Sequence, residues 1–303
     1  MKLSNLNETN RAAPPRLILT ESKHSHFIPD KDDLSSSVIE RFQQEVYCHY
    51  RNHGRILPWR LTEDPYRILV SEIMLQQTQV ERVCPKYALF LSSFPNFETL
   101  AHAKLQRVLE VWQGLGYNRR ALALKKIAQI TVQEFKSTLP SDYATLISLP
   151  GIGPATARAI RAFAFNLPEV FIETNIRTVF IHVFFADSQG IKDADIYPLV
   201  EQTLDRSNPR TWYYALMDYG VLLKKKYENP SRRSAHSRKQ AAFKGSNREV
   251  RGRILSLITA NPGITETELM RRLDSDPARI SLNLAKLESE GFFKRKQNEF
   301  IVD

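Results

Sequence analysis

The stretch LISLPGIGPATARAI, residues 146–160, predicts two helices joined by a tight turn. The first helix ends at Leu149, and the second begins near Pro154, a residue type favoured at the first position of a helix. Gly151 and Gly153 lie between them and let the backbone approach another backbone closely. The N–H groups of the turn and of the new helix carry positive partial charge, so they suit one phosphate group of DNA.

A glycine-rich loop for a dinucleotide is the alternative for this stretch. That motif follows a strand and has a third glycine, whereas the residues before Pro150 are helical in pattern and no third glycine follows. The stretch resembles instead the helix-hairpin-helix motif of DNA repair proteins. We therefore expect binding to DNA without a preference for base sequence.

Length and charge favour a nucleic-acid partner. The 303 residues suffice for two or three domains, and the formal net charge of +10 favours nucleic acid or another anionic surface. There is no apolar run of about 20 residues and no secretory signal pattern, so we expect no membrane segment. Cys48 and Cys84 are too few for a disulfide framework or a four-thiolate cluster. We expect a monomer in a reducing cytoplasm, associated with the nucleoid if the source is prokaryotic.

Helical periodicity on both sides of the hairpin predicts an all-α body. Residues 1–34 are polar and contain Pro14-Pro15, so we expect a flexible arm there. The next helix begins at Ser36 and ends before Gly54. Further helices are expected at about 65–76, 79–93, 97–101, 104–112, 118–136, 142–148, 154–165, 174–186, 194–206 and 210–225.

The composition becomes basic between residues 224 and 253, with eleven Lys or Arg and two Glu. We interpret residues 224–247 as a linker. A solvated connector is one explanation. The explanation we favour is a segment that contacts DNA phosphates through Arg232, Arg233 and Lys239, with an affinity that falls as salt rises.

Residues 248–303 predict three helices followed by a short hairpin. Thr265 and Glu268 have the spacing of a capping box, and Asp276-Pro277 opens the third helix. This pattern resembles a winged helix-turn-helix domain. Such domains read DNA or bind partner proteins, and the sequence leaves both functions open.

Glu72 interrupts an apolar helix pattern in DPYRILVSEIMLQQTQVERVCPKY, residues 64–87. A carboxyl group beside apolar neighbours such as Ile73 is costly to ionise, so its pKa would rise and it would suit a general acid. The alternative is a surface glutamate on the polar face of the helix. Gln76 and Gln77 follow with amides that can bind base edges or fill the gap left by a displaced base.

The stretch GLGY, residues 114–117, predicts a helix-breaking turn that presents Tyr117. An aromatic ring beside positive charges suits stacking on a base next to a charged backbone. The alternative is a plain turn with a half-buried tyrosine. The following helix carries the basic residues Arg119, Arg120, Lys125 and Lys126.

Glu173 begins a predicted helix in VFIETNIRTVF, residues 170–180. Taken alone, a carboxylate at a helix start is a cap or a partner of the helix dipole. Thr174 and Asn175 follow it as further polar residues. The sequence around this glutamate does not by itself distinguish a cap from a catalytic group.

Together the segments LPWR, DPYRILVSEIMLQQTQV, GLGY, LPGIGPATARAI, ETNIRTV and ALMDYG resemble the helix-hairpin-helix (HhH-GPD) DNA glycosylase superfamily. The resemblance extends over about residues 35–223 and is greatest to the MutY-type adenine DNA glycosylases, with endonuclease III as a cousin. It implies two all-α lobes with DNA in the cleft between them. One lobe would contain about residues 57–167, and the other residues 35–56 and 168–223.

The resemblance also implies a reaction, the hydrolysis of an N-glycosidic bond after the nucleotide is flipped out of the duplex. Glu72 matches the acid that protonates the leaving base. Glu173 and Asn175 match the carboxylate that stabilises the sugar cation and an active-site asparagine. The DNA contacts expected with them are Gln76 and Tyr117 as wedges in the base stack, together with Gln77, Arg119, Gly151, Gly153 and Ala155.

The chain departs from this family at four places. The lysine that makes endonuclease III a lyase would fall at Ala155, so we expect a monofunctional glycosylase. The four cysteines of an iron–sulfur cluster, which commonly follow the ALMDYG segment, are missing, so we expect no cluster and no other cofactor or metal. A winged helix replaces the Nudix-related domain with which such glycosylases read 8-oxoguanine. Glu173 replaces an aspartate, which moves the carboxylate by roughly 1 Å and can cost about a hundredfold in rate.

We therefore expect the removal of adenine from an A/G or A/8-oxoG mispair in double-stranded DNA. A glycosylase for thymine or uracil mismatches, or for another damaged base, is the alternative within the class. A non-catalytic DNA-binding protein is the alternative outside it. Glu72 favours the enzyme, and the changed Glu173 favours the binding protein.

Overall fold

A computed structural model of the chain describes residues 34–185, 188–237 and 242–302. Helices form the body, so the predicted all-α fold class is confirmed. The N-terminal arm expected up to residue 33 and the basic Lys239 lie outside the described residues. Within those residues, no helix combines the length and the apolar character needed to cross a membrane.

The predicted helices are present, with bounds that differ from the expected ones by a few residues at most. The helices of the body are α1 (Ser36–His53), α2 (Pro65–Leu75), α3 (Val80–Ser93), α4 (Phe97–His102), α5 (Leu105–Trp112), α6 (Arg119–Glu134), α7 (Tyr143–Ser148), α8 (Pro154–Phe165), α9 (Thr174–Phe184), α10 (Asp193–Thr203) and α11 (Pro209–Lys226). Two short 3₁₀ turns are η1 (Pro58–Arg60) and η2 (Pro230–Arg233). The C-terminal unit contains α12 (Asn247–Ala260), α13 (Glu266–Arg272), α14 (Pro277–Ser289) and an antiparallel hairpin of β1 (Lys294–Lys296) and β2 (Glu299–Ile301).

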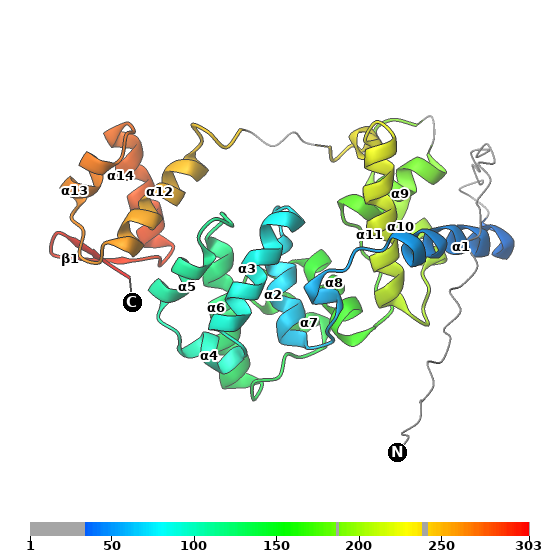
Figure 1. The fold of residues 1–303 in the computed structure, drawn as a ribbon, viewed down its shortest axis with the longest axis horizontal. Coiled ribbons are helices and arrows are strands. Elements are labelled where there is room, and N and C mark those ends of the chain that lie inside the picture. Colours follow the sequence, from blue (N-terminus) through cyan, green and yellow to red (C-terminus); the bar gives the residue numbers. More distant parts are fainter. Residues whose placement is uncertain (1–33, 186–187, 238–241, 303) are drawn as a thin grey trace, which may run out of the picture.

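Helix α2 is the centre of the first lobe, which contains α2–α8 (Figure 1). Asp64 caps its N-terminus by accepting a hydrogen bond from the backbone N–H of Tyr66 at 2.9 Å, and Pro65 occupies the first helical position. Most of the helix is buried, because α3, α6 and α8 pack around it. Fully buried Leu69 and Ile73 recur at a spacing of four residues, as a helix face toward a core requires.

Arg120 of α6 fixes the C-terminal end of α2. Its buried guanidinium donates hydrogen bonds of 2.6–2.9 Å to three carbonyl groups that end α2, those of Ile73, Met74 and Gln76. The other end of the guanidinium binds the carbonyls of Leu115 and Gly116 in the GLGY turn. The carbonyls at the end of α2 have no partner within that helix. One cation therefore satisfies them and joins the GLGY turn to α2. The sequence grouped Arg120 with the basic residues beside Tyr117 that would suit a DNA backbone, whereas in the structure Arg120 binds carbonyl groups inside the lobe.

The second lobe combines α1 with α9, α10 and α11, helices far from it in the sequence (Figure 1). Phe42 of α1 is central to its core. The ring of Phe42 meets the rings of Phe180, Phe184 and Trp212 edge-to-face, with centroids 5.4–5.7 Å apart. Such pairs add specific geometry to the apolar burial that holds α1 on α9 and α11.

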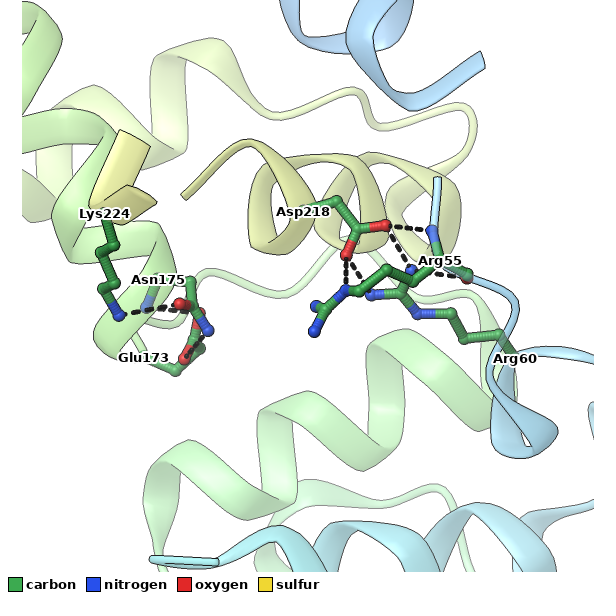
Figure 2. Close-up of polar contacts among 6 residues, drawn as sticks. All are labelled: Arg55, Arg60, Glu173, Asn175, Asp218 and Lys224. Atoms are coloured by element: carbon green, nitrogen blue, oxygen red, sulfur yellow. Dashed lines mark hydrogen bonds and ion pairs between the residues drawn. The ribbon is translucent and has the colours of Figure 1, made fainter. Parts of the chain in front are cut away.

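Asp218 of α11 joins the second lobe to the segment that enters the first. Its side chain is 2% exposed and binds Arg55 at 2.6 Å and Arg60 at 2.8 Å (Figure 2). Burial alone would raise the pKa of the Asp218 carboxyl, but the hydrogen bonds and charges of Arg60 and Arg55 lower it below its usual value. The chain between α1 and α2 is therefore held on α11 by a buried ion pair.

The C-terminal unit packs on the first lobe through α12 and α5 (Figure 1). Gln106 of α5 donates a hydrogen bond to the carbonyl of Thr259 at 3.1 Å, and Arg119 pairs with Glu290. Within the unit, Thr265 caps α13 as its spacing predicts, although the carboxylate of Glu268 binds Arg271 and Arg272 instead of completing a capping box.

We predict that Asp218→Asn lowers the free energy of unfolding by about 3–5 kcal/mol, because it leaves the buried guanidinium of Arg60 and the partly exposed one of Arg55 without a counter-charge. Urea unfolding at pH 7 measures the change. The difference from the unchanged protein should narrow in acid, since the stability that Asp218 supplies is present above its unfolded pKa of about 3.9 and is lost as pH falls through its lowered folded-state pKa.

Glu201→Gln is the matched control, because Glu201 and Arg206 form an exposed pair at 3.9 Å. This control should change stability by no more than about 0.5 kcal/mol. Equal effects of the two substitutions would contradict a structural role for Asp218.

Candidate active site

A pocket of about 560 Å³ lies between the two lobes. Residues from α2 and α8 of the first lobe line one side, and residues from α9 and α11 of the second lobe line the other. The chain thus brings together side chains that are about 150 residues apart in the sequence. The residues that line this pocket include six that matter for its chemistry, namely Glu72, Gln76, Ala155, Glu173, Asn175 and Lys224.

Glu72 extends into the pocket from α2, between the buried residues Ser71 and Ile73. Burial, followed by the nearby negative charge of Glu173, raises the pKa of the Glu72 carboxyl to about 8. No hydrogen bond joins this carboxyl to another residue of the described ranges, so nothing offsets the cost of ionising it. Glu72 therefore holds a proton at neutral pH and can donate it.

Glu173 is both a helix cap and a wall of the pocket. Its Oε1 accepts hydrogen bonds from the backbone N–H groups of Asn175 at 2.7 Å and Ile176 at 2.9 Å, at the N-terminus of α9. Its Oε2 accepts a third from the side-chain amide of Asn175 at 3.2 Å. Three N–H donors and the positive end of the helix dipole suit an ionised carboxylate. The two interpretations of Glu173 that the sequence offered are compatible in one geometry.

Lys224 lines the same pocket, a position that the sequence did not indicate. Its Nζ donates a hydrogen bond to Oδ1 of Asn175 at 2.8 Å (Figure 2). Burial lowers the pKa of Lys224, while the charge of Glu173 acts in the opposite direction. We expected an enzyme without lyase activity because the sequence places Ala155, and no amine, at the lyase position. In the structure Ala155 lines the pocket, and the amine of Lys224 from α11 lines it as well.

Gly220 lets α11 approach α9 at this point. A Cβ atom at Gly220 would lie 2.4 Å from the carbonyl oxygen of Asn175, closer than side chains approach a backbone. Lys224 lies one turn further along α11, on the same face. The spacing of Gly220 and Lys224 was the one sequence signal that could have placed this lysine in the site.

The predicted hairpin between α7 and α8 is present. Gly151 has φ +78°, and a Cβ there would lie 2.9 Å from the side chain of Ala123. Gly153 is the exposed N-cap of α8. The amide of Gln76 donates to the carbonyl of Gly151 at 3.2 Å and to Oγ1 of Thr156 at 3.3 Å. The hairpin and the end of α2 therefore form one edge beside the pocket.

The GLGY turn lines a second cavity of about 880 Å³, which lies between the first lobe and α12. Gln77 and Tyr117 have positive φ angles of 55° and 47°, a left-handed conformation that costs energy in residues other than glycine. Arg248 of α12 donates a hydrogen bond to the Tyr117 hydroxyl at 2.6 Å, and its guanidinium lies 5.5 Å from the ring centroid. The predicted pairing of an aromatic ring with positive charge is present, and α12 supplies part of it.

The basic segment after α11 is used partly inside the protein. Arg232 is exposed and pairs with Glu228 at 3.1 Å. Arg233 donates to the carbonyls of Ile181, at 3.0 Å, and Phe185, which end α9. Arg233 is therefore a helix cap, and Arg232 keeps the exposure that a phosphate contact requires.

The same segment does not fit an iron–sulfur cluster. The family resemblance would place four cysteines here, but η2 and a bridge between Ile191 and Ser234 occupy the place. Cys48 and Cys84 are free cysteines of α1 and α3. Within the described ranges, no group of three or more His, Cys, Asp or Glu side chains could hold a metal ion.

Comparisons with known proteins agree with this geometry. The family model "HhH-GPD superfamily base excision DNA repair protein" matches residues 70–205, and "Winged helix-turn-helix DNA-binding" matches residues 248–294. An adenine DNA glycosylase of Mycolicibacterium smegmatis is 31% identical over 270 residues, which are 83% of this chain and 92% of the relative. An adenine DNA glycosylase of Buchnera aphidicola subsp. Baizongia pistaciae is 40% identical over 187 residues, or 60% of this chain. The chain covers only 52% of the length of that second relative.

Solved structures show the same fold at lower identity. A thermostable thymine-DNA glycosylase aligns with a TM-score of 0.55 and 22% identity over 63% of this chain and 90% of its own. The fold is thus that of a two-lobed helix-hairpin-helix glycosylase, with a winged helix added at the C-terminal end. The chain belongs to the HhH-GPD superfamily of base excision DNA repair proteins, with adenine DNA glycosylases among its relatives.

We predict that Gly220→Ala lowers the free energy of unfolding by about 1–3 kcal/mol, the usual cost of forcing extra atoms into a packed contact. Urea unfolding measures it. Gly252→Ala is the control, because a Cβ at Gly252 of α12 meets nothing within 4 Å. This control should be neutral or stabilising by up to about 1 kcal/mol. If Gly220→Ala were as stable as the control, the contact between α9 and α11 would not be tight.

Proposed function

We propose that the protein is a monofunctional DNA glycosylase that hydrolyses the N-glycosidic bond of a flipped-out, mispaired base. The observation that carries this proposal is a pair of carboxyl groups with unlike environments in one pocket. Burial raises the pKa of Glu72 to about 8, whereas Glu173 accepts three N–H hydrogen bonds. These surroundings suit Glu72 to donate a proton and hold the Glu173 carboxyl group in a fixed place.

The two groups suit the two demands of the reaction. When the bond between base and sugar breaks, the base needs a proton and the sugar develops positive charge. Glu72 supplies the proton to the leaving base. Glu173 offers a carboxylate to the sugar, held by the backbone at the start of α9, so that it does not have to reorganise during the reaction. Water then adds to the sugar and completes the hydrolysis.

Adenine is the base we propose, in an A/G or A/8-oxoG mispair. The names of the relatives support this choice, since both the Buchnera and the Mycolicibacterium proteins are adenine DNA glycosylases. A thymine- or uracil-mismatch glycosylase, or one for another damaged base, is the alternative that the same pocket would allow. The replacement of aspartate by Glu173 is the observation that keeps a non-catalytic DNA-binding protein as the alternative from another class.

Double-stranded DNA is the partner in this proposal. The exposed hairpin at Gly151 and Gly153 and the net charge of +10 support phosphate contacts beside the pocket. Gln76 and Gln77 end α2 at the rim, where they could fill the gap left by a flipped base. Arg119 and Arg232 are further exposed candidates for phosphate contacts. We propose a monomer that works in the cytoplasm, as the sequence predicts, without an iron–sulfur cluster.

We predict that Glu72→Gln slows base release by at least about a hundredfold, the contribution of a well-placed general acid. Duplexes carrying A, T, U, hypoxanthine or oxidised bases in different mispairs are incubated with the protein and treated with hot alkali, which breaks DNA at sites that have lost a base. In the unchanged protein, the apparent second-order rate constant should fall as the pH rises above about 8, because Glu72, with a pKa of about 8, then loses its proton.

Glu134→Gln is the matched control, since Glu134 is an exposed residue at the end of α6. This control should release base at the unchanged rate. Tight binding of the mispaired duplexes without release of any base would instead support the non-catalytic alternative. Release of thymine or uracil, with adenine left intact, would correct the choice of base.

A further inference from the structure

Lys224 has no role in the reaction as described so far, although it belongs to the pocket. Hydrogen bonds join three side chains in a line, from Lys224 through Asn175 to Glu173. Lys224 Nζ lies 2.8 Å from Asn175 Oδ1, and Asn175 Nδ2 lies 3.2 Å from Glu173 Oε2 (Figure 2). Two different helices contribute to this line, α11 through Lys224 and α9 through Asn175.

The two ends of the Asn175 amide differ in hydrogen-bonding character. An ammonium group has three donors and no acceptor, so it must meet the oxygen of the amide. The NH₂ group of the same amide then points at Glu173 and donates to its carboxylate. If the amide turned over, its oxygen would face the carboxylate and two acceptors would repel each other. Lys224 and Glu173 thus favour the same orientation of the amide, and Lys224 holds the Asn175 side chain from its other end.

Among the cations that the described residues place at the pocket, Lys224 is the one that binds the Asn175 side chain. Arg55 and Arg60 line the pocket, but Asp218 binds both of them. Arg177 lies near Lys224 on α9, and its guanidinium is bound by Asp193 of α10 through two hydrogen bonds of 2.7 Å. Glu173 is the acidic group whose charge acts on Lys224, and it raises the pKa of Lys224 against the effect of burial.

We propose that Lys224 is a positioning residue, whose hydrogen bond to Asn175 aims the Glu173 carboxylate at the sugar. This inference rests on the proposed glycosylase function. The close approach at Gly220 supports it, because the same contact fixes the backbone of Asn175 and the helix that carries Lys224. Lys224 acts through Asn175, so the two residues form one functional unit.

The test compares Lys224→Met, which keeps the aliphatic stem and removes the amine, with Lys224→Arg, which keeps a cationic donor. Lys225→Met is the matched control, because Lys225 is the next residue of α11, is exposed, and loses the same charge. Single-turnover base release and the Kd for the same mispaired duplex are measured in the full chain.

We expect Lys224→Met to slow release about ten- to a hundredfold relative to Lys225→Met, with similar Kd values, since misplacement of a reacting group affects rate more than binding. Lys224→Arg should recover most of the rate. Lys224→Met combined with Asn175→Ala should be no slower than Asn175→Ala alone, because coupled residues are not additive.

Three results would overturn the inference while leaving the glycosylase function intact. These are equal rates for Lys224→Met and Lys225→Met, additive effects of Lys224→Met and Asn175→Ala, or a borohydride-trapped DNA adduct that Lys224→Met abolishes. The last result would make Lys224 a nucleophile that forms a Schiff base and would also end the monofunctional assignment.

A measurement without turnover separates failure of this inference from failure of the function. In ¹⁵N-labelled protein, the side-chain NH₂ signals of Asn175 are those that Asn175→Ala removes. They should shift in Lys224→Met and stay in place in Lys225→Met. Unchanged signals in Lys224→Met would refute the positioning contact even if the unchanged protein released no base from any duplex.

Discussion

The tight contact between α9 and α11 is the constraint on which the site depends. Helix α11 carries three residues with separate tasks within two turns. Asp218 binds the arginines that lead into the first lobe, Gly220 lets α9 come within backbone distance, and Lys224 binds Asn175. Because one rigid helix holds all three, the spacing of the lobes and the orientation of the Glu173–Asn175 pair are set together.

The pocket gives two glutamates different surroundings. Glu72 lies on a helix interior, where main-chain N–H groups are already used by the helix and cannot reach the carboxyl. Glu173 lies at a helix start, where N–H groups are free and point toward it. Burial and the charge of Glu173 therefore raise the pKa of Glu72, whereas backbone N–H groups hold the Glu173 carboxylate in place.

Most of the fold could be predicted from the sequence, because apolar periodicity and capping residues act locally. Helix α2 was expected at 65–76 and spans Pro65–Leu75, and the hairpin at Gly151 follows from its glycines. The tasks of several cations could not be predicted. Arg120, Arg233 and Lys224 read as surface charges in a basic chain, yet each binds carbonyl or amide oxygens of another element. Those partners are remote in sequence, and no local pattern indicates which face of a helix a long basic side chain will serve.

Arg233 completes the second lobe at the C-terminal end of α9. The guanidinium closes α9 with hydrogen bonds to Ile181 and Phe185, and a main-chain bridge from Ile191 to Ser234 holds the turn beside it. None of these groups is a thiol or changes its oxidation state. Hydrogen bonds of the chain itself therefore close this end of α9, the helix whose other end carries Glu173 as its N-cap.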